Sequence, residues 1–267
     1  MKVLRIKFSL QSINYIAQVL KFTLVLYVIS FCLKLKKGAV ISSVLVVENG
    51  FSELFSFWIE KSIAILLLFC LVALFFKVAY KPASWVITVF LMGYALLGYF
   101  NGGKAFLELS LLSAISKWWL PILTLYAMTR YFKGQVRLSR WFVFSIQFSI
   151  FIIFMAHGIG CFLNNGLYID YIIGFVRDYT ALSIQQQQAE QLLTIIGIID
   201  VVVAVLVLVK PFKALLYWII FWGFLTALLR IVDASILNYA ELLMRVPHFG
   251  LPLALLIILN QKIEPVN

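Results

Sequence analysis

The feature that most constrains this chain is its series of long, continuous apolar segments. Most of them approach the roughly 20 residues that a helix needs to cross the hydrocarbon core of a bilayer. They do not alternate between apolar and polar residues as the strands of a membrane β-barrel do, so they predict helices. Hydrophobic residues make up 64% of the sequence and charged residues 12%, whereas a soluble domain is about half apolar and about one quarter charged. We therefore predict an all-α integral membrane protein.

The apolar segments predict eight transmembrane helices. They cover Ile13–Leu33, Ser62–Tyr80, Ser84–Phe100, Leu109–Phe132, Trp141–Phe162, Gln191–Val209, Ala214–Leu229 and Leu242–Leu259. Two Lys-Pro links, Lys81-Pro82 and Lys210-Pro211, are expected to join neighbouring spans as tight hairpins, because proline ends one helix and suits the start of the next. The basic N-terminal flank has no convincing small-residue cleavage site, so we expect a retained first span and not a removed signal peptide.

The charge distribution predicts the orientation in the membrane. The chain has a net charge of +11, and with eight alternating spans nearly all of this excess falls on the side that holds both termini. Basic and acidic residues balance on the other side. Because Lys and Arg are enriched in cytoplasmic segments, we expect cytoplasmic N- and C-termini in a cell inner (cytoplasmic) membrane. The basic excess is thus attributed to topology in the lipid bilayer, and no nucleic acid partner is expected.

The two halves of the chain resemble each other at an offset of about 130 residues, a spacing close to that of one four-helix repeat unit. The landmarks that align are Glu60 with Glu190, Cys70 with Asp200, Met92-Gly93 with Trp222-Gly223, Glu108 with Glu241, and Pro121 with Pro252. They predict two tandem parallel four-helix units, residues 1–132 and 133–267, related by an axis along the membrane normal. The alternative is that two sets of apolar helices align through composition alone.

Several short motifs in the second half resemble a known family. They are His157-Gly158, Tyr168-Ile-Asp-Tyr-Ile, Gly197-Ile-Ile-Asp200, Trp222-Gly223, Thr226-Ala227-Leu-Leu-Arg230 and Arg245-Val-Pro-His-Phe-Gly-Leu-Pro252. In this order they are similar to the DoxX-like four-helix membrane family, which carries a Gly-x-x-acid pattern in its second span. The resemblance covers about residues 141–262, and the first half shows it only weakly. It implies redox- or quinone-linked work, with a quinone as the compatible cofactor and a redox partner protein at the outer face.

Polar residues of the second half are expected to form a candidate pocket at the outer ends of the last four spans. They are His157, Asp200, Arg230, Asp233, Glu241, Arg245 and His248. Asp200 lies about ten residues into its span, where a carboxylate should be protonated, paired or facing a cavity, and neither His157 nor Arg230 is expected to reach it. Glu241 precedes Arg245 by four residues, the favourable order for an ion pair within one helix. The alternative to a pocket is a simple interfacial ion pair at a helix start.

Other polar residues leave several functions open. Lys117 is the buried charge of the first half and aligns with His248 when the prolines are matched. A haem held by His157 and His248 is not favoured. Cys32 and Cys161 could form a disulfide, or both could remain free thiols. The Cys and His spacing predicts no metal site. Besides the redox role, a transporter with Asp200 and Lys117 along its path, or a structural assembly protein, fits the sequence, and whether the chain is an enzyme stays open.

Overall fold

The computed structural model describes residues 8–35, 40–101, 107–180, 182–230 and 239–261, and within them it contains helices and no β-strand. The helices are α1 (Leu10–Leu35), α2 (Val40–Ser43), the π-helical turn η1 (Val44–Glu48), α3 (Glu53–Ala73), α4 (Tyr80–Phe100), α5 (Leu107–Phe132), α6 (Arg140–Phe162), α7 (Gly166–Tyr179), α8 (Gln186–Val209), α9 (Lys213–Leu228), α10 (Tyr239–Met244) and α11 (Val246–Leu259). The all-helical prediction is confirmed for these residues.

Seven helical segments of the described chain are long and apolar enough to cross a membrane. They are α1, α3, α4, α5, α6, α8 and the segment Tyr239–Leu259 that contains α10 and α11. The seventh predicted span, Ala214–Leu229, corresponds to α9, which has 16 residues and is the only predicted span missing from these seven segments. At about 1.5 Å per residue this helix is roughly 24 Å long, shorter than the roughly 30 Å of a hydrocarbon core. The chain is a multi-pass membrane protein, and the count of eight full spans is met only in part.

The second predicted span, Ser62–Tyr80, is wrong at both ends. The helix begins earlier because the Ser52 side chain caps it, accepting a hydrogen bond from the Phe55 backbone N–H. It ends at Ala73 and is followed by turns that lead into α4. Lys81-Pro82 is consequently not the link itself but lies in the first turn of α4, where proline is tolerated.

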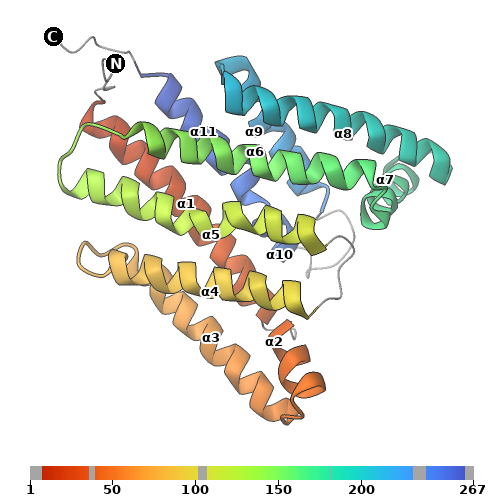
Figure 1. Ribbon diagram of the computed structural model, residues 1–267, viewed down its shortest axis with the longest axis horizontal. Helices are drawn as coiled ribbons and strands as arrows, with labels where there is room; N and C mark the ends of the chain where they lie inside the picture. The colour runs from red at the N-terminus through yellow and green to blue at the C-terminus, as the bar shows by residue number, and fades with distance from the viewer. Residues whose placement is uncertain (1–7, 36–39, 102–106, 181, 231–238, 262–267) are drawn as a thin grey trace.

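The bundle is organised around α1, which packs against α3, α5, α10 and α11 (Figure 1). In turn, α6 packs against α5, α8 and α11, α4 packs against α5, and α9 packs against α11. The start of α1 lies beside the link between α5 and α6, where the Phe8 N–H donates to the Val136 carbonyl at 2.8 Å. The Ser12 hydroxyl of α1 also donates to the Gln261 side chain just after α11. These contacts gather both ends of the described chain and the central link at one end of the bundle.

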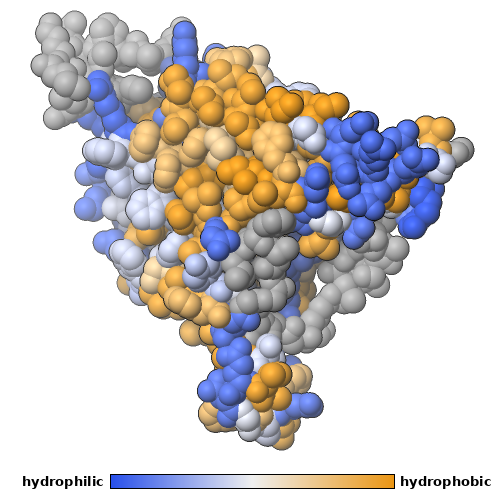
Figure 2. Space-filling model, turned by 45° about the vertical axis from the view of Figure 1, so that its right-hand side comes forward, coloured by the Kyte–Doolittle hydropathy of each residue, from blue (hydrophilic) through white to orange (hydrophobic). Residues whose placement is uncertain are grey.

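The outer surface of the bundle is largely apolar. Large hydrophobic side chains such as Phe69, Val78 and Trp141 are 69%, 91% and 77% exposed. Figure 2 shows a broad hydrophobic surface over the helices, with the largest hydrophilic patch toward the right of that view and smaller ones along the left edge and at the bottom. A soluble monomer rarely exposes such a large contiguous apolar area, so this surface is suited to lipid.

Candidate functional site

The centre of the site is a buried hydrogen-bonded group between α6, α8 and α9. Asp200 of α8 is 1% exposed. Its Oδ2 atom lies 2.6 Å from Nδ1 of His157, and the Trp222 indole N–H donates to its Oδ1 atom at 3.2 Å. The expectation that His157 would not reach Asp200 is therefore wrong. The two side chains meet because α6 and α8 cross closely at Gly158 and Gly197, next to His157 and three residues before Asp200.

Two glycines allow α6 and α8 to approach closely at this group. A Cβ atom on Gly158 would lie 2.8 Å from Val201 Cγ2 and 3.0 Å from the Gly197 carbonyl oxygen. A Cβ atom on Gly197 would lie 3.1 Å from the Gly158 carbonyl oxygen. Small residues of this kind let helix backbones come together inside membranes. The Gly-x-x-acid pattern thus has a physical role here: Gly197 closes the crossing, and Asp200, one turn later, meets His157.

An aromatic layer covers His157 on the side of α7. The Tyr168 ring stacks on the His157 ring with centroids 4.8 Å apart. The Arg230 guanidinium lies 3.6 Å from the centroid of the Tyr171 ring, a cation–π contact. Burial, followed by the nearby Arg245 charge, lowers the pKa of Arg230 to about 10, so Arg230 remains a cation at neutral pH. The contacts described for Arg230 are thus with the rings of Tyr168 and Tyr171, and Asp233 of the predicted pocket lies outside the described residues.

A cavity of about 660 Å³ lies beside His157. We call it the outer cavity, a name that follows the orientation predicted from the charge distribution. Its walls come from α5, α6, α7, α10 and the start of α11. The polar residues that line it are Ser110, Ser113, Lys117, His157, Asn165, Tyr168, Asp170, Glu241, Arg245 and His248. A smaller void of about 10 Å³ is bounded by Asp200, Trp222 and both histidines. The structure therefore brings together His157, Glu241, Arg245 and His248 with Lys117 of the first half, and places Asp200 just behind His157.

The segment that carries Glu241, Arg245 and His248 is not one continuous helix. It breaks at Arg245, between α10 and α11, with Pro247 in the first turn of α11. Glu241 was expected to pair with Arg245 in its own helix. It instead forms an ion pair with Lys34 of α1, with Glu241 Oε1 2.6 Å from Lys34 Nζ. At the break, Nδ1 of His248 donates to the Arg245 carbonyl at 3.1 Å. Since a carbonyl can only accept, this bond leaves the Nε2 atom of neutral His248 as its acceptor.

The cysteines are free thiols. Cys32 donates to the Ala64 carbonyl at 3.7 Å, so the disulfide considered between Cys32 and Cys161 is not formed. Cys161 instead lies one turn after His157 on α6, with Sγ 3.8 Å from His157 Nδ1. The ligand atoms of His157, Cys161 and Asp200 all lie within 4.8 Å of one another. The linear spacing of Cys and His did not reveal this group, because its third member comes from another helix.

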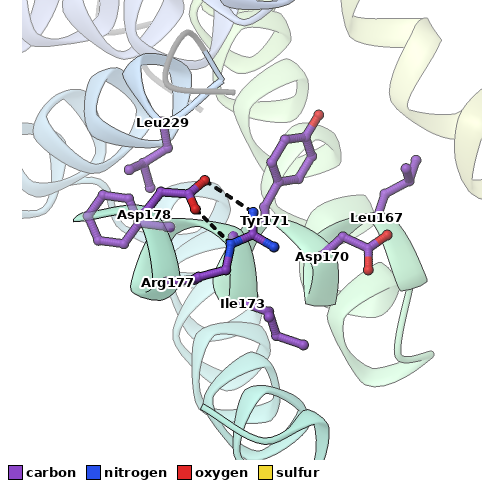
Figure 3. A pocket seen from close by; sticks show the side chains of 9 residues that line it. Leu167, Asp170, Tyr171, Ile173, Arg177, Asp178 and Leu229 are labelled. Atoms are coloured by element: carbon purple, nitrogen blue, oxygen red, sulfur yellow. Dashed lines mark hydrogen bonds and ion pairs between the residues drawn. The ribbon is translucent and has the colours of Figure 1, made fainter. Parts of the chain in front are cut away.

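A second cavity, of about 390 Å³, lies on the other side of α7 (Figure 3). It is bounded by Leu167, Asp170 and Tyr171 of α7 and by Leu229 after α9. Figure 3 also shows the exposed pair in which the Arg177 guanidinium donates to Asp178 at 2.7 Å. This hydrogen bond lowers the pKa of the Asp178 carboxyl. Leu167 and Asp170 line both cavities, so α7 is the partition between them.

Comparison of this chain with protein-family models, with curated proteins and with solved structures finds no match. The resemblance of its second half to the DoxX-like family consequently stays a prediction from the motifs around His157, Asp200 and Arg245.

Proposed function

We propose that this chain is a DoxX-like multi-pass subunit of the inner membrane that binds a quinone-type head group in the outer cavity and works with a redox partner protein at that face. The observation that carries the proposal is the His157–Asp200 hydrogen bond of 2.6 Å in the wall of a cavity that also contains fixed cations. Buried carboxylates inside membrane helices are costly, and they commonly mark ligand or proton sites.

The walls of the outer cavity suit a flat ring with oxygen acceptors at its edges. Apolar side chains, among them Ile153 and Met244, provide contact for a ring. Lys117 of α5 and Arg245 at the break before α11 supply hydrogen-bond donors from different helices. Complete reduction of a quinone takes up two electrons and two protons. In our proposal the electrons come from the partner protein. His157, oriented by Asp200, passes one proton to a ring oxygen and regains it from water, and the second proton reaches the other ring oxygen from water in the cavity.

The tandem arrangement is part of the same proposal, and helix packing supports it. In the first half α1 contacts α3 and α5, and α4 contacts α5. In the second half α6 contacts α8 and α11, and α9 contacts α11, which is the same set of pairs in the same order. The contacts between the halves, α1 with α11 and α5 with α6, are also equivalent under exchange of the halves. Parallel units related by an axis along the membrane normal would pack in this way.

Quinone binding by the protein extracted mildly from its own membrane tests the proposal. Native mass spectrometry should find a bound quinone, and a short-chain quinone should quench tryptophan fluorescence with saturation. Asp200→Asn should weaken binding about tenfold, which equals about 1.4 kcal/mol, by changing the hydrogen bond to His157. Asp178→Asn is the matched control, because Asp178 lies in the exposed pair with Arg177, and it should bind like the wild type.

Two results would contradict this function. Absence of both co-purified quinone and saturable quenching by the wild type would rule out a quinone site. Equal quinone binding by Asp200→Asn and the wild type would show that the His157–Asp200 pair does not contribute to binding in the cavity. Substrate-dependent flux in liposomes in place of quinone binding would favour a transporter.

A further inference from the structure

Beyond its place in the proposed function, the buried group at the α6–α8 crossing has the composition of a metal site. His157 and Cys161 are one turn apart on α6, and Asp200 faces both from α8. The three offer one nitrogen, one sulfur and one oxygen ligand, all within 4.8 Å of one another. Cys161 and Asp200 are 0% and 1% exposed, so the group is closed on the side away from the outer cavity.

We propose that His157, Cys161 and Asp200 bind a divalent transition-metal ion of the Zn²⁺ type. Tetrahedral Zn²⁺ lies about 2.0–2.3 Å from nitrogen, oxygen and sulfur ligands, which places those ligand atoms about 3.3–3.7 Å from one another. The distance from Cys161 Sγ to His157 Nδ1 is 3.8 Å, close to this range. The distance from His157 Nδ1 to Asp200 Oδ2 is 2.6 Å, so these two atoms would separate by less than about 1 Å.

The charge and the surroundings of the group also suit such an ion. A thiolate and a carboxylate together balance two positive charges, so the filled site is neutral, as a site buried among apolar helices requires. Mixed sulfur and imidazole ligands favour Zn²⁺ and related ions over Mg²⁺ and Ca²⁺, which prefer oxygen. The Trp222 indole donates to the other oxygen of Asp200 and would orient this ligand. The void of about 10 Å³ beside Asp200 and His157 is close to the volume that one water needs, which supplies a fourth ligand.

Binding changes the protonation of two groups. The Cys161 thiol loses its proton to solvent as the sulfur bonds to the ion, and the proton on His157 Nδ1 moves to Nε2 or leaves. The ion therefore takes the place of the proton between His157 and Asp200. Metal binding itself does not depend on the proposed function, but its consequence does: in a quinone-binding protein, the bound ion would block proton exchange at this wall.

Cobalt binding to the full-length protein in detergent tests the site directly. Co²⁺ added to metal-free wild type should give a near-ultraviolet thiolate-to-cobalt charge-transfer band and visible ligand-field bands, at one ion per chain, and Zn²⁺ should displace it. Cys161→Ser should abolish the charge-transfer band and weaken binding by at least about 100-fold, because changes outside the ligand shell alone cost about 10- to 100-fold. Cys70→Ser removes another buried free thiol, in α3, and is the matched control that should keep the full spectrum.

Thermal unfolding of the metal-free variants verifies that each one folds, and Cys161→Ala provides a second removal of the sulfur ligand. A wild type without the charge-transfer band, or a folded Cys161→Ser protein that keeps it, overturns the metal site. Quinone quenching measured on metal-free protein is independent of these spectra, so failure of one proposal is distinguishable from failure of the other.

Discussion

The closeness of the α6–α8 crossing can be tested by adding a single methyl group at Gly158. A Cβ atom there would lie 2.8 Å from Val201 Cγ2 and 3.0 Å from the Gly197 carbonyl oxygen, so the helices must separate or Val201 must shift. Adding a methyl group to a well-packed interior costs about 1–3 kcal/mol. Alanine also favours a helix over glycine by about 1 kcal/mol, which hides part of this cost.

Gly93→Ala separates the two effects. Gly93 lies within α4, and a Cβ atom there would meet nothing within 4 Å. Both variants gain the same helix preference, so the difference between them reports packing alone. We expect Gly158→Ala to be about 1–3 kcal/mol less stable than Gly93→Ala, a difference of roughly 2–12 °C in Tm for a chain of this size.

Thermal unfolding in a single detergent, followed by circular dichroism and by tryptophan fluorescence, measures this difference. Equal Tm values for Gly158→Ala and Gly93→Ala would refute the close crossing, and with it the reason that His157 reaches Asp200. A lower Tm together with weaker quinone quenching would connect the crossing to the outer cavity.

Three further outcomes are expected from other contacts. Trp222→Phe removes a hydrogen bond to the Asp200 carboxylate and should lower the free energy of unfolding by about 1.5–3 kcal/mol in denaturant titrations. Trp218→Phe, which leaves that bond in place, is its control. Equal losses of stability in the two variants would contradict a stabilising Trp222–Asp200 hydrogen bond. A double-mutant cycle of Lys34→Ala and Glu241→Ala should give a coupling of only about 0.2–1 kcal/mol, because these side chains are 29% and 42% exposed; a coupling above about 2 kcal/mol would mean that the pair is buried in the membrane. Fusions to the C-terminus should be active with a cytoplasmic fluorescent reporter and inactive with a periplasmic phosphatase, and the reverse pattern would overturn the orientation drawn from charge.

The sequence predicted the class of fold because lipid imposes a simple rule on composition and length. Long apolar runs identified the membrane-spanning helices, and the Lys210-Pro211 link correctly separated two of them. The errors occurred where a polar residue alone determines the end of a helix. Ser52 caps α3 about ten residues before the apolar run that defines the span, and α8 begins at Gln186, in a stretch that hydropathy assigns to a loop.

The candidate site was harder to predict than the fold because its contacts depend on how far one helix is shifted along another. His157 and Asp200 were both selected as polar residues of the second half, yet their contact depends on the close approach of α6 and α8 at Gly158 and Gly197. Glu241 was expected to pair four residues along its own segment, whereas its partner Lys34 lies more than 200 positions away in α1. Neither contact can be predicted from the spacing of residues within one helix. The group that we propose as a metal site could not be predicted for the same reason, since His157 and Cys161 need Asp200 from α8 to form it.

The outer cavity depends on both halves of the chain. The first half contributes the α5 wall with Lys117, and the second contributes His157, Arg245 and His248. The Lys34–Glu241 ion pair joins α1 to α10 beside the same cavity. A four-helix unit on its own would lack one wall, and two identical units would have to provide the same residues twice. In the tandem arrangement that we propose, each unit would need to keep the side chains of one wall only, which would account for the buried carboxylate and both histidines in the second half and the lysine in the first.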